Sequence, residues 1–245
     1  MSHFGLGLIS GQGLPGNDAF TKVLLHFDGT NGGTSYPDTN AGGSSHTWTN
    51  NAGSVTNTSN ANPKFGPTAL SIPFTAGAEY VSTPDHADFD VGSGAFTVDF
   101  WFNPFNSGAS YSTSGLAGQG VETSFTGFSW LIYRNSGGTV TFFVSNGVSG
   151  NGPTSTTVFN TNAWFHIAAV KTAAGVLKLF VNGIQEGGDV SWNYAVPNVS
   201  TALAVGRAGT STTHTTTFGS FDEFRFSVGI ARWTANFTPP VSAYT

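Results

Sequence analysis

Apolar and polar side chains alternate along residues 220–227 (SFDEFRFS). A period of two is typical of a β-strand, because successive side chains of a strand point to opposite faces of its sheet. Strict alternation predicts two faces, with Asp222, Phe224 and Phe226 on one and Phe221, Glu223 and Arg225 on the other. We therefore expect a strand whose aromatic side meets a core and whose carboxylate end meets a cation.

The same pattern recurs along the chain. Residues 96–103 (FTVDFWFN) carry Phe or Val at every even position and Thr, Asp, Trp or Asn at every odd one, which predicts one core face and one half-polar face. Residues 22–27 (KVLLHF) are nearly continuous in apolar side chains and predict a strand buried on both sides. Further strands are predicted at 69–72, 79–82, 128–134, 139–145, 164–171, 176–182 and 203–206.

Turn residues separate these strands. Residues 135–138 (NSGG) predict a hairpin between two strands, and Asn182-Gly183 is a strong signal for a type I′ turn. No segment of ten or more residues keeps a helical stripe, so we expect few helices. Many short strands broken by Gly and Pro predict an all-β fold, a two-sheet antiparallel sandwich or a barrel.

Composition narrows the class of protein. A chain of 245 residues is within the range of one large all-β domain, and 22 Phe residues provide the core. The sequence has no Cys, so it forms no disulfide and no zinc–thiolate site. Charged residues make up only 9%, with a net charge of -5, which argues against nucleic-acid binding. No stretch is apolar for long enough to insert into a membrane.

Several pieces of the chain together resemble a known family. In order they are LLHFDG (24–29), Phe65-Gly66, Ala69-Leu70, Glu79-Tyr80-Val81, FTVDFWF (96–102), WFHIAAVK (164–171), LFVNG (179–183) and FDEFRFSVGIARWTANFTPP (221–240). Over about residues 22–240 the chain is similar to the laminin-G-like jelly roll of the concanavalin A-like lectin and glucanase superfamily. The resemblance implies two antiparallel sheets, one of them concave, with the first and last strands adjacent. Such domains occur in adhesins, carbohydrate-active proteins and phage virion proteins.

Adjacent first and last strands would bring two carboxylates together. If these strands pair antiparallel, Asp28 at the end of one approaches Asp222 at the start of the other. Two partly buried carboxylates repel each other unless a proton or a cation lies between them. Calcium suits such a place, and members of the superfamily often carry a structural calcium, so we expect Ca²⁺ at Asp28 and Asp222. The alternative is that Asp28 caps its own turn and that Asp222 pairs with Arg225, Arg207 or backbone amides.

A second group of possible metal ligands lies in the loop at residues 84–90 (PDHADFD). Its Asp85, His86, Asp88 and Asp90 are metal-binding residue types, but the glycine and the terminal glutamate of a calcium loop are missing. We interpret this loop as turn and capping chemistry.

The sequence does not indicate an enzyme. A glucanase of this fold places two carboxylates on one face of one strand, whereas Asp99 stands alone among aromatic residues and Asp222 and Glu223 are expected on opposite faces. The chain has no Gly-x-Ser-x-Gly elbow. His166 and His26 lie within predicted strands, where we interpret them as satisfied sheet residues.

Two non-enzymatic functions remain open. Residues 1–21 predict an N-terminal arm before a domain at 22–245, which is either a flexible tail or a segment that orders against another subunit or another virion protein. No signal peptide is evident at the N-terminus, so a secreted type of fold favours a phage virion protein, a capsid decoration or tail component released by lysis. The alternative is a lectin or adhesin domain that binds cell-surface glycans through loop aromatics, with candidates Trp48, Tyr111, Phe125, Trp192 and Tyr194.

Overall fold

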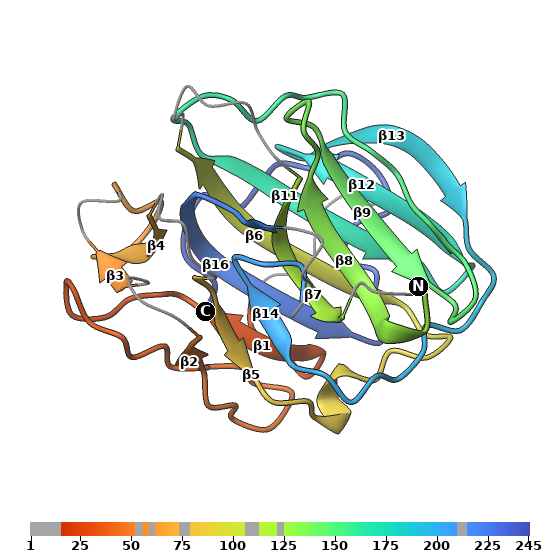
Figure 1. Cartoon of the computed structure of the whole chain (residues 1–245), viewed down its shortest axis with the longest axis horizontal. Coiled ribbons are helices and arrows are strands. Elements are labelled where there is room, and N and C mark those ends of the chain that lie inside the picture. The colour runs from red at the N-terminus through yellow and green to blue at the C-terminus, as the bar shows by residue number, and fades with distance from the viewer. Residues whose placement is uncertain are drawn as a thin grey trace, which may run out of the picture.

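The computed structural model of the chain consists of two antiparallel β-sheets that face each other across an aromatic core (Figure 1). The structure describes residues 16–51, 56–58, 62–73, 79–105, 113–121, 125–209 and 215–245. This is the predicted β-sandwich of the jelly-roll type, and the predicted scarcity of helices is confirmed in the described part, where only two short 3-10 helices interrupt the strands, η2 (Ala87–Phe89) and η3 (Phe125–Gly127).

The first sheet, here called sheet A, has the order β13-β12-β11-β6-β16-β4-β3, and β1 pairs with β16 beside β4. Its strands are β1 (Thr21–Leu25), β3 (Thr56–Thr58), β4 (Ala69–Ile72), β6 (Phe96–Pro104), β11 (Phe165–Lys171), β12 (Val176–Val181), β13 (Ile184–Ser191) and β16 (Gly219–Val228).

The second sheet, sheet B, has the order β10-β9-β8-β7-β14-β5-β2, and β15 pairs with β7. Its strands are β2 (Thr49–Asn50), β5 (Val81–Thr83), β7 (Ser114–Gly120), β8 (Phe128–Arg134), β9 (Val140–Ser145), β10 (Gly150–Asn151), β14 (Leu203–Val205) and β15 (Thr215–Thr216).

The predicted pairing of the first and last strands is confirmed. β1 runs antiparallel to β16, with Leu25 opposite Phe224. The predicted turns also form: Asn182 and Gly183 both have positive φ angles, 49° and 78°, and join β12 to β13 as a type I′ turn. No helix in the described ranges has both the length and the apolar character that a membrane span requires.

The core lies between the sheets and consists largely of aromatic rings. Phe96 of β6 lies 6.2 Å from Phe226 of β16 and 6.3 Å from Trp130 of β8, measured between ring centroids. Trp130 is in turn 5.5 Å from Phe226, so the rings of the two sheets interdigitate. Contacts at these separations add to the stabilisation that burial of the rings supplies.

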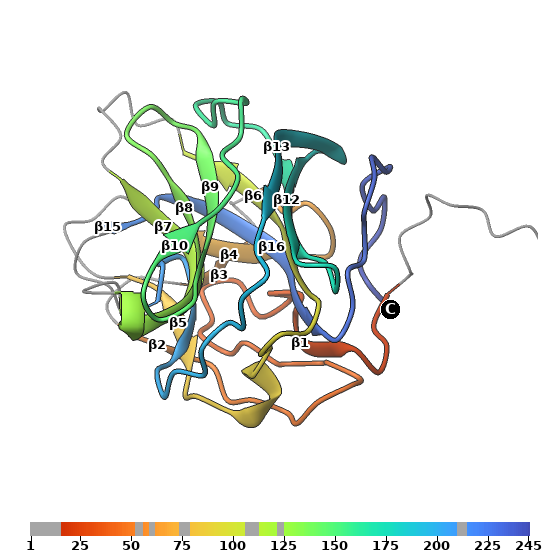
Figure 2. The same cartoon turned by 90° about the vertical axis from the view of Figure 1, so that its right-hand side faces the viewer.

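Both described ends of the chain lie on the outer face of sheet A. Figure 2 shows the sandwich edge-on, with sheet B on the left, sheet A to its right and the C-terminal segment beyond sheet A. Trp233 and Phe237 of that segment form a buried cluster with Ala168 and Phe180 of sheet A. The Asn17 amide donates to the Thr245 carbonyl oxygen at 3.1 Å, so the two ends also contact each other. The C-terminal segment therefore covers part of the outer face of sheet A, over β11 and β12.

Candidate functional site

The long strand β16 contains a bulge that changes its predicted faces. Asp222 lies opposite Trp101 and Arg225 opposite Asp99, so two residues of β16 face one residue of β6, and Glu223 has a left-handed φ of 52°. The strict alternation predicted for 220–227 is therefore wrong. Three Phe side chains of β16 lie in the core cluster between the sheets, Phe221, Phe224 and Phe226.

Asp222 is fully buried at this bulge. Its Oδ2 accepts hydrogen bonds from the backbone amides of Lys64 at 2.9 Å and Phe65 at 3.1 Å, while its Oδ1 has no hydrogen-bond partner among the described residues. Burial, with smaller contributions from the charges of Glu223 and Asp28, raises the pKa of Asp222 to about 8. The alternative stated from the sequence, that Asp222 pairs with backbone amides, is therefore correct for Oδ2 and not for Oδ1.

Asp28 contacts the same turn from the other side. It is an exposed residue, and a Cβ atom added to Gly66 would lie only 2.1 Å from its Oδ1. Partial burial raises the pKa of Asp28. A hydrogen bond with the Thr68 backbone lowers this pKa, but by less. Asp28 and Asp222 thus flank the Lys64–Thr68 segment, and the charge of Asp28 contributes to the raised pKa of Asp222.

Glu223 does not complete a three-carboxylate site with them. Its Oε1 lies 2.7 Å from His26 Nδ1, and its Oε2 accepts the Tyr244 amide at 2.8 Å. A calcium ion at Asp28 and Asp222 would therefore need main-chain carbonyl oxygens and water for its remaining ligands, which Ca²⁺ accepts. Asp222 Oδ1, which has no hydrogen-bond partner in the described structure, could serve as the carboxylate ligand. Calcium at this place stays a prediction.

A further buried carboxylate, that of Asp99, forms an ion pair with an arginine. Asp99 is fully buried and receives two hydrogen bonds from Arg225. Burial raises the pKa of Asp99, but the Arg225 charge and, to a smaller degree, His166 outweigh it and hold the pKa at about 2. His166 Nε2 lies 3.6 Å from Asp99 Oδ2, longer than a hydrogen bond, so His166 is buried without the partner expected from the sequence. These groups hold strands and chain ends together, and no reaction is assigned to them.

The aromatic residues predicted to stack on sugars have different surroundings. Trp48 and Trp192 are buried, Tyr111 lies outside the described residues, and the structure does not describe the side chain of Phe125. Tyr194 has 58% of its surface exposed, and its ring meets that of Trp192 edge to face at 5.4 Å. Of the five candidates, Tyr194 is the exposed one among those whose side chains are described.

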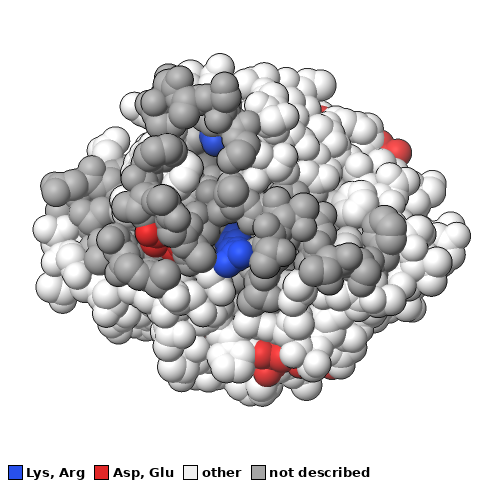
Figure 3. All heavy atoms as spheres, viewed as in Figure 1, with Lys and Arg blue, Asp and Glu red and all other residues white. Residues whose placement is uncertain are grey.

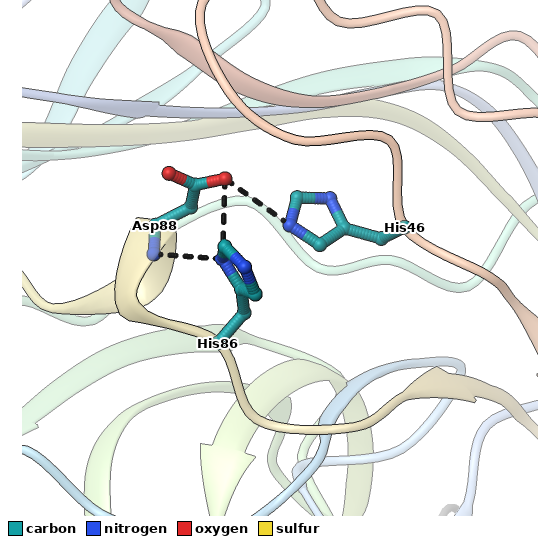
Figure 4. A group of neighbouring side chains, drawn as sticks. All are labelled: His46, His86 and Asp88. Atoms are coloured by element: carbon teal, nitrogen blue, oxygen red, sulfur yellow. Dashed lines mark hydrogen bonds and ion pairs between the residues drawn. The ribbon is translucent and has the colours of Figure 1, made fainter.

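The loop at 85–90 forms the capping structure that the sequence predicted. His86 is the N-cap of η2, and its Nδ1 accepts the Asp88 amide at 3.1 Å. The same loop also meets His46, which the sequence reasoning missed because 40 residues separate it from His86 and no motif links them. Figure 4 shows both imidazoles directed at the Asp88 carboxylate. Among the described residues, these are the only three His, Asp or Glu side chains whose ligand atoms all lie within 4.8 Å of one another.

Comparison with protein families gives one match. Residues 75–229 match the model described as the concanavalin A-like lectin/glucanases superfamily, which is the resemblance seen in the sequence. A search of curated proteins gave no significant match.

Solved structures of binding domains share the fold. The binding domain of Paraclostridial Mosquitocidal Protein 1 has a TM-score of 0.63 and 12% identity, over 86% of this chain and 50% of that one. The binding domain of botulinum neurotoxin DC, in complex with rat synaptotagmin II, gives 0.64 and 12%, over 87% and 49%. The chain thus spans about half the length of these toxin domains. Domain 4 of an extracellular arabinanase from Geobacillus stearothermophilus, in complex with arabinotriose, gives 0.60 and 16%, over 89% and 95%.

Proposed function

Because the chain belongs to the concanavalin A-like lectin/glucanases superfamily, we propose that it is a non-catalytic module that binds a carbohydrate. The observation that carries this proposal is the likeness to the arabinotriose-bound domain, because that likeness extends over nearly the whole length of both chains. The toxin domains match over only half of theirs. Identity is low in every case, so the sugar itself is open.

The described part of one face of the molecule suits an uncharged ligand. Figure 3 views the molecule from the side of sheet B, and few Lys, Arg, Asp or Glu side chains are visible among the described residues on that face. Neutral glycans bind through aromatic faces and hydrogen bonds rather than through charge. Tyr194 provides such a ring, and its edge-to-face contact with the buried Trp192 would limit the side-chain entropy lost on binding.

A glycan array, followed by calorimetry on any hit, tests this function. The array includes arabinan oligosaccharides together with hexose, sialylated and amino-sugar glycans. Saturable binding with no release of reducing ends on long incubation is the expected outcome. Cleavage of a bound glycan would refute the non-catalytic assignment, and the absence of binding to any glycan would refute the lectin assignment.

A structural role in a large assembly, a phage virion, is our second proposal. It is supported by the position of the segment at Gly16 and Asn17, which lies against Thr245 and Arg225 on the outer face of sheet A. The described part of the chain therefore begins at one defined place on the domain, and we propose that the residues before Gly16 contact a neighbouring subunit from there. Purification of native particles tests this proposal. A fixed ratio of this chain to a capsid or tail protein supports it, and a freely soluble monomer in the lysate contradicts it.

The two proposals are compatible, since a virion can display a glycan-binding domain.

We also propose a structural Ca²⁺ at Asp28 and Asp222. The support is the buried Asp222 Oδ1, which has no hydrogen-bond partner in the described structure and would gain one from a cation.

A further inference from the structure

Two histidines and one aspartate converge at one end of the sandwich. His46 lies in the connection between β1 and β2, whereas His86 and Asp88 belong to η2 and its N-cap. Asp88 Oδ2 is 3.4 Å from His46 Nε2 and 3.2 Å from His86 Nδ1 (Figure 4). Gly43 allows this approach, because a Cβ atom at its position would lie 2.7 Å from Asp88 Oδ2.

Asp38 fixes which nitrogen of His46 faces this cluster. Its Oδ2 lies 2.7 Å from His46 Nδ1, and its Oδ1 accepts the backbone amides of Leu24 and Asn40. A carboxylate only accepts hydrogen bonds, so His46 Nδ1 carries a proton, and in the neutral imidazole Nε2 presents its lone pair. That Nε2 is buried and has no hydrogen-bond partner among the described residues. A carboxylate behind an imidazole is the usual arrangement of a metal-binding histidine.

His86 brings an unprotonated nitrogen to the same carboxylate. Its Nδ1 accepts the Asp88 amide at 3.1 Å, so this nitrogen carries no proton, and a metal ion bound to it would replace that hydrogen bond. Asp88 Oδ2 receives one proper donor, the Ser44 amide at 2.7 Å. In the neutral imidazoles, two unprotonated nitrogens and one carboxylate oxygen therefore lie within 4.8 Å of one another, and a cation among them would be attracted to all three.

The separations match those of metal ligands. In a tetrahedral site with metal–ligand bonds of about 2.0–2.1 Å, neighbouring ligand atoms lie roughly 3.3 Å apart. The distances of 3.4 Å and 3.2 Å from Asp88 Oδ2 to the two nitrogens agree with this separation between ligand atoms. Imidazole nitrogen suits Zn²⁺ and the neighbouring first-row divalent ions, whereas Ca²⁺ and Mg²⁺ prefer oxygen alone.

We propose that His46, His86 and Asp88 bind a divalent transition-metal ion, with Zn²⁺ the best fit, and that Asp38 is the positioning residue for His46. The side chains of His46, His86 and Asp88 are 4%, 41% and 20% exposed, so the site is closed on the His46 side and open on the other. The fourth ligand is then water or a group of a bound partner. The metal would tie the loop after β1 to η2, independently of the carbohydrate-binding proposal.

The test uses the tag-free full chain, first stripped of metal with a chelator that is then removed. Binding of ZnCl₂ is measured by titration calorimetry and by thermal melting. We expect one Zn²⁺ per chain and a higher melting temperature with Zn²⁺, with no such response to Mg²⁺ at this site. Co²⁺ in place of Zn²⁺ should give the visible absorption of a tetrahedral ion. The variant His86→Asn keeps an N-cap acceptor and removes the imidazole, so it should fold normally and bind Zn²⁺ at least about tenfold more weakly.

Two further variants keep the result interpretable. Asp38→Asn should weaken Zn²⁺ binding roughly 10–100-fold, as for other carboxylates behind a metal-bound imidazole. Asp85→Asn is the matched control in the same loop, since Asp85 accepts a hydrogen bond from Gln119 and lies outside the cluster, and it should bind Zn²⁺ like the parent. A parent chain that binds no Zn²⁺, or a folded His86→Asn variant that binds it equally well, would overturn the proposal.

Discussion

Arg225 and Asp99 form a fully buried, two-point ion pair across the two central strands of sheet A. Arg225 Nε lies 3.0 Å from Asp99 Oδ1, and Nη2 lies 3.1 Å from Oδ2. The same guanidinium donates through Nη1 to the Gly16 carbonyl at 2.7 Å and lies 3.7 Å from the centre of the Tyr244 ring. One side chain thus connects β6 and β16 with both described ends of the chain.

The first prediction concerns loss of this pair. Arg225→Leu leaves the Asp99 carboxylate buried without its partner, so we expect the free energy of unfolding to fall by about 3–5 kcal/mol. Urea unfolding at neutral pH measures this change. The double variant Asp99→Leu/Arg225→Leu removes both charges and should be more stable than the single Arg225 variant. A single variant within about 1 kcal/mol of the parent would show that the pair is not desolvated as described.

The second prediction concerns pH. The folded-state pKa of Asp222 is about 8, against 3.8 for an unperturbed aspartate, so between these values the folded chain holds a proton that the unfolded chain has released. The free energy of unfolding should therefore fall as pH rises from about 4 to about 8, by up to about 1.4 kcal/mol for each pH unit from this group. Asp222→Asn lacks this titration. In chelator, the stability difference between parent and variant should shift in favour of the variant as pH rises; a difference independent of pH would contradict the prediction.

The third prediction uses the same variant to test calcium. At pH 8 a cation beside the ionised Asp222 carboxylate replaces the missing proton and stabilises the folded chain. Addition of Ca²⁺ should raise the melting temperature of the parent and not that of Asp222→Asn. If chelator and Ca²⁺ leave the melting temperature of the parent unchanged, the calcium prediction fails while the pH prediction still stands.

The fourth prediction concerns the segment that covers sheet A. Trp233 stacks on Phe237 at 4.1 Å between ring centroids and meets His166 at 5.7 Å. Because it is buried there, Trp233→Ala should lower the free energy of unfolding by about 3–5 kcal/mol in urea. Val241→Ala is the control in the same segment; Val241 is 86% exposed, so its truncation should change stability by less than about 0.5 kcal/mol. Equal effects of the two variants would mean that the segment does not pack on sheet A.

Sequence periodicity predicted the strands that are regular. The even residues of 96–103 enter the core as expected, the turns at 135–138 and 182–183 form, and the first and last strands pair. Periodicity failed at β7 (SGLAGQG), a buried strand for which no alternation was visible. Its glycines are needed for close approach: a Cβ atom at Gly115 would lie 1.8 Å from the Ala208 backbone nitrogen.

The site was only partly predictable for two physical reasons. The bulge depends on a left-handed Glu223, a conformation that sequence patterns associate with Gly or Asn, so the faces of Asp222 and Phe221 were assigned wrongly. His46 meets His86 and Asp88 only through the path of a long loop, and periodicity carries no information about such a path. The pairing of the first and last strands, on which the prediction for Asp28 and Asp222 rests, is confirmed, and the charge of Asp28 contributes to the raised pKa of Asp222.

The central claim is carbohydrate binding by a rigid surface aromatic, and calorimetry with the best glycan from the array tests it most directly. Tyr194→Ala should weaken binding of that glycan about fivefold or more, because stacking contributes on the order of 1 kcal/mol or more, with the melting temperature unchanged. Ile184→Ala is the control, since Ile184 is also exposed and should leave affinity unchanged. Undiminished binding by a folded Tyr194→Ala variant would contradict the account of this surface.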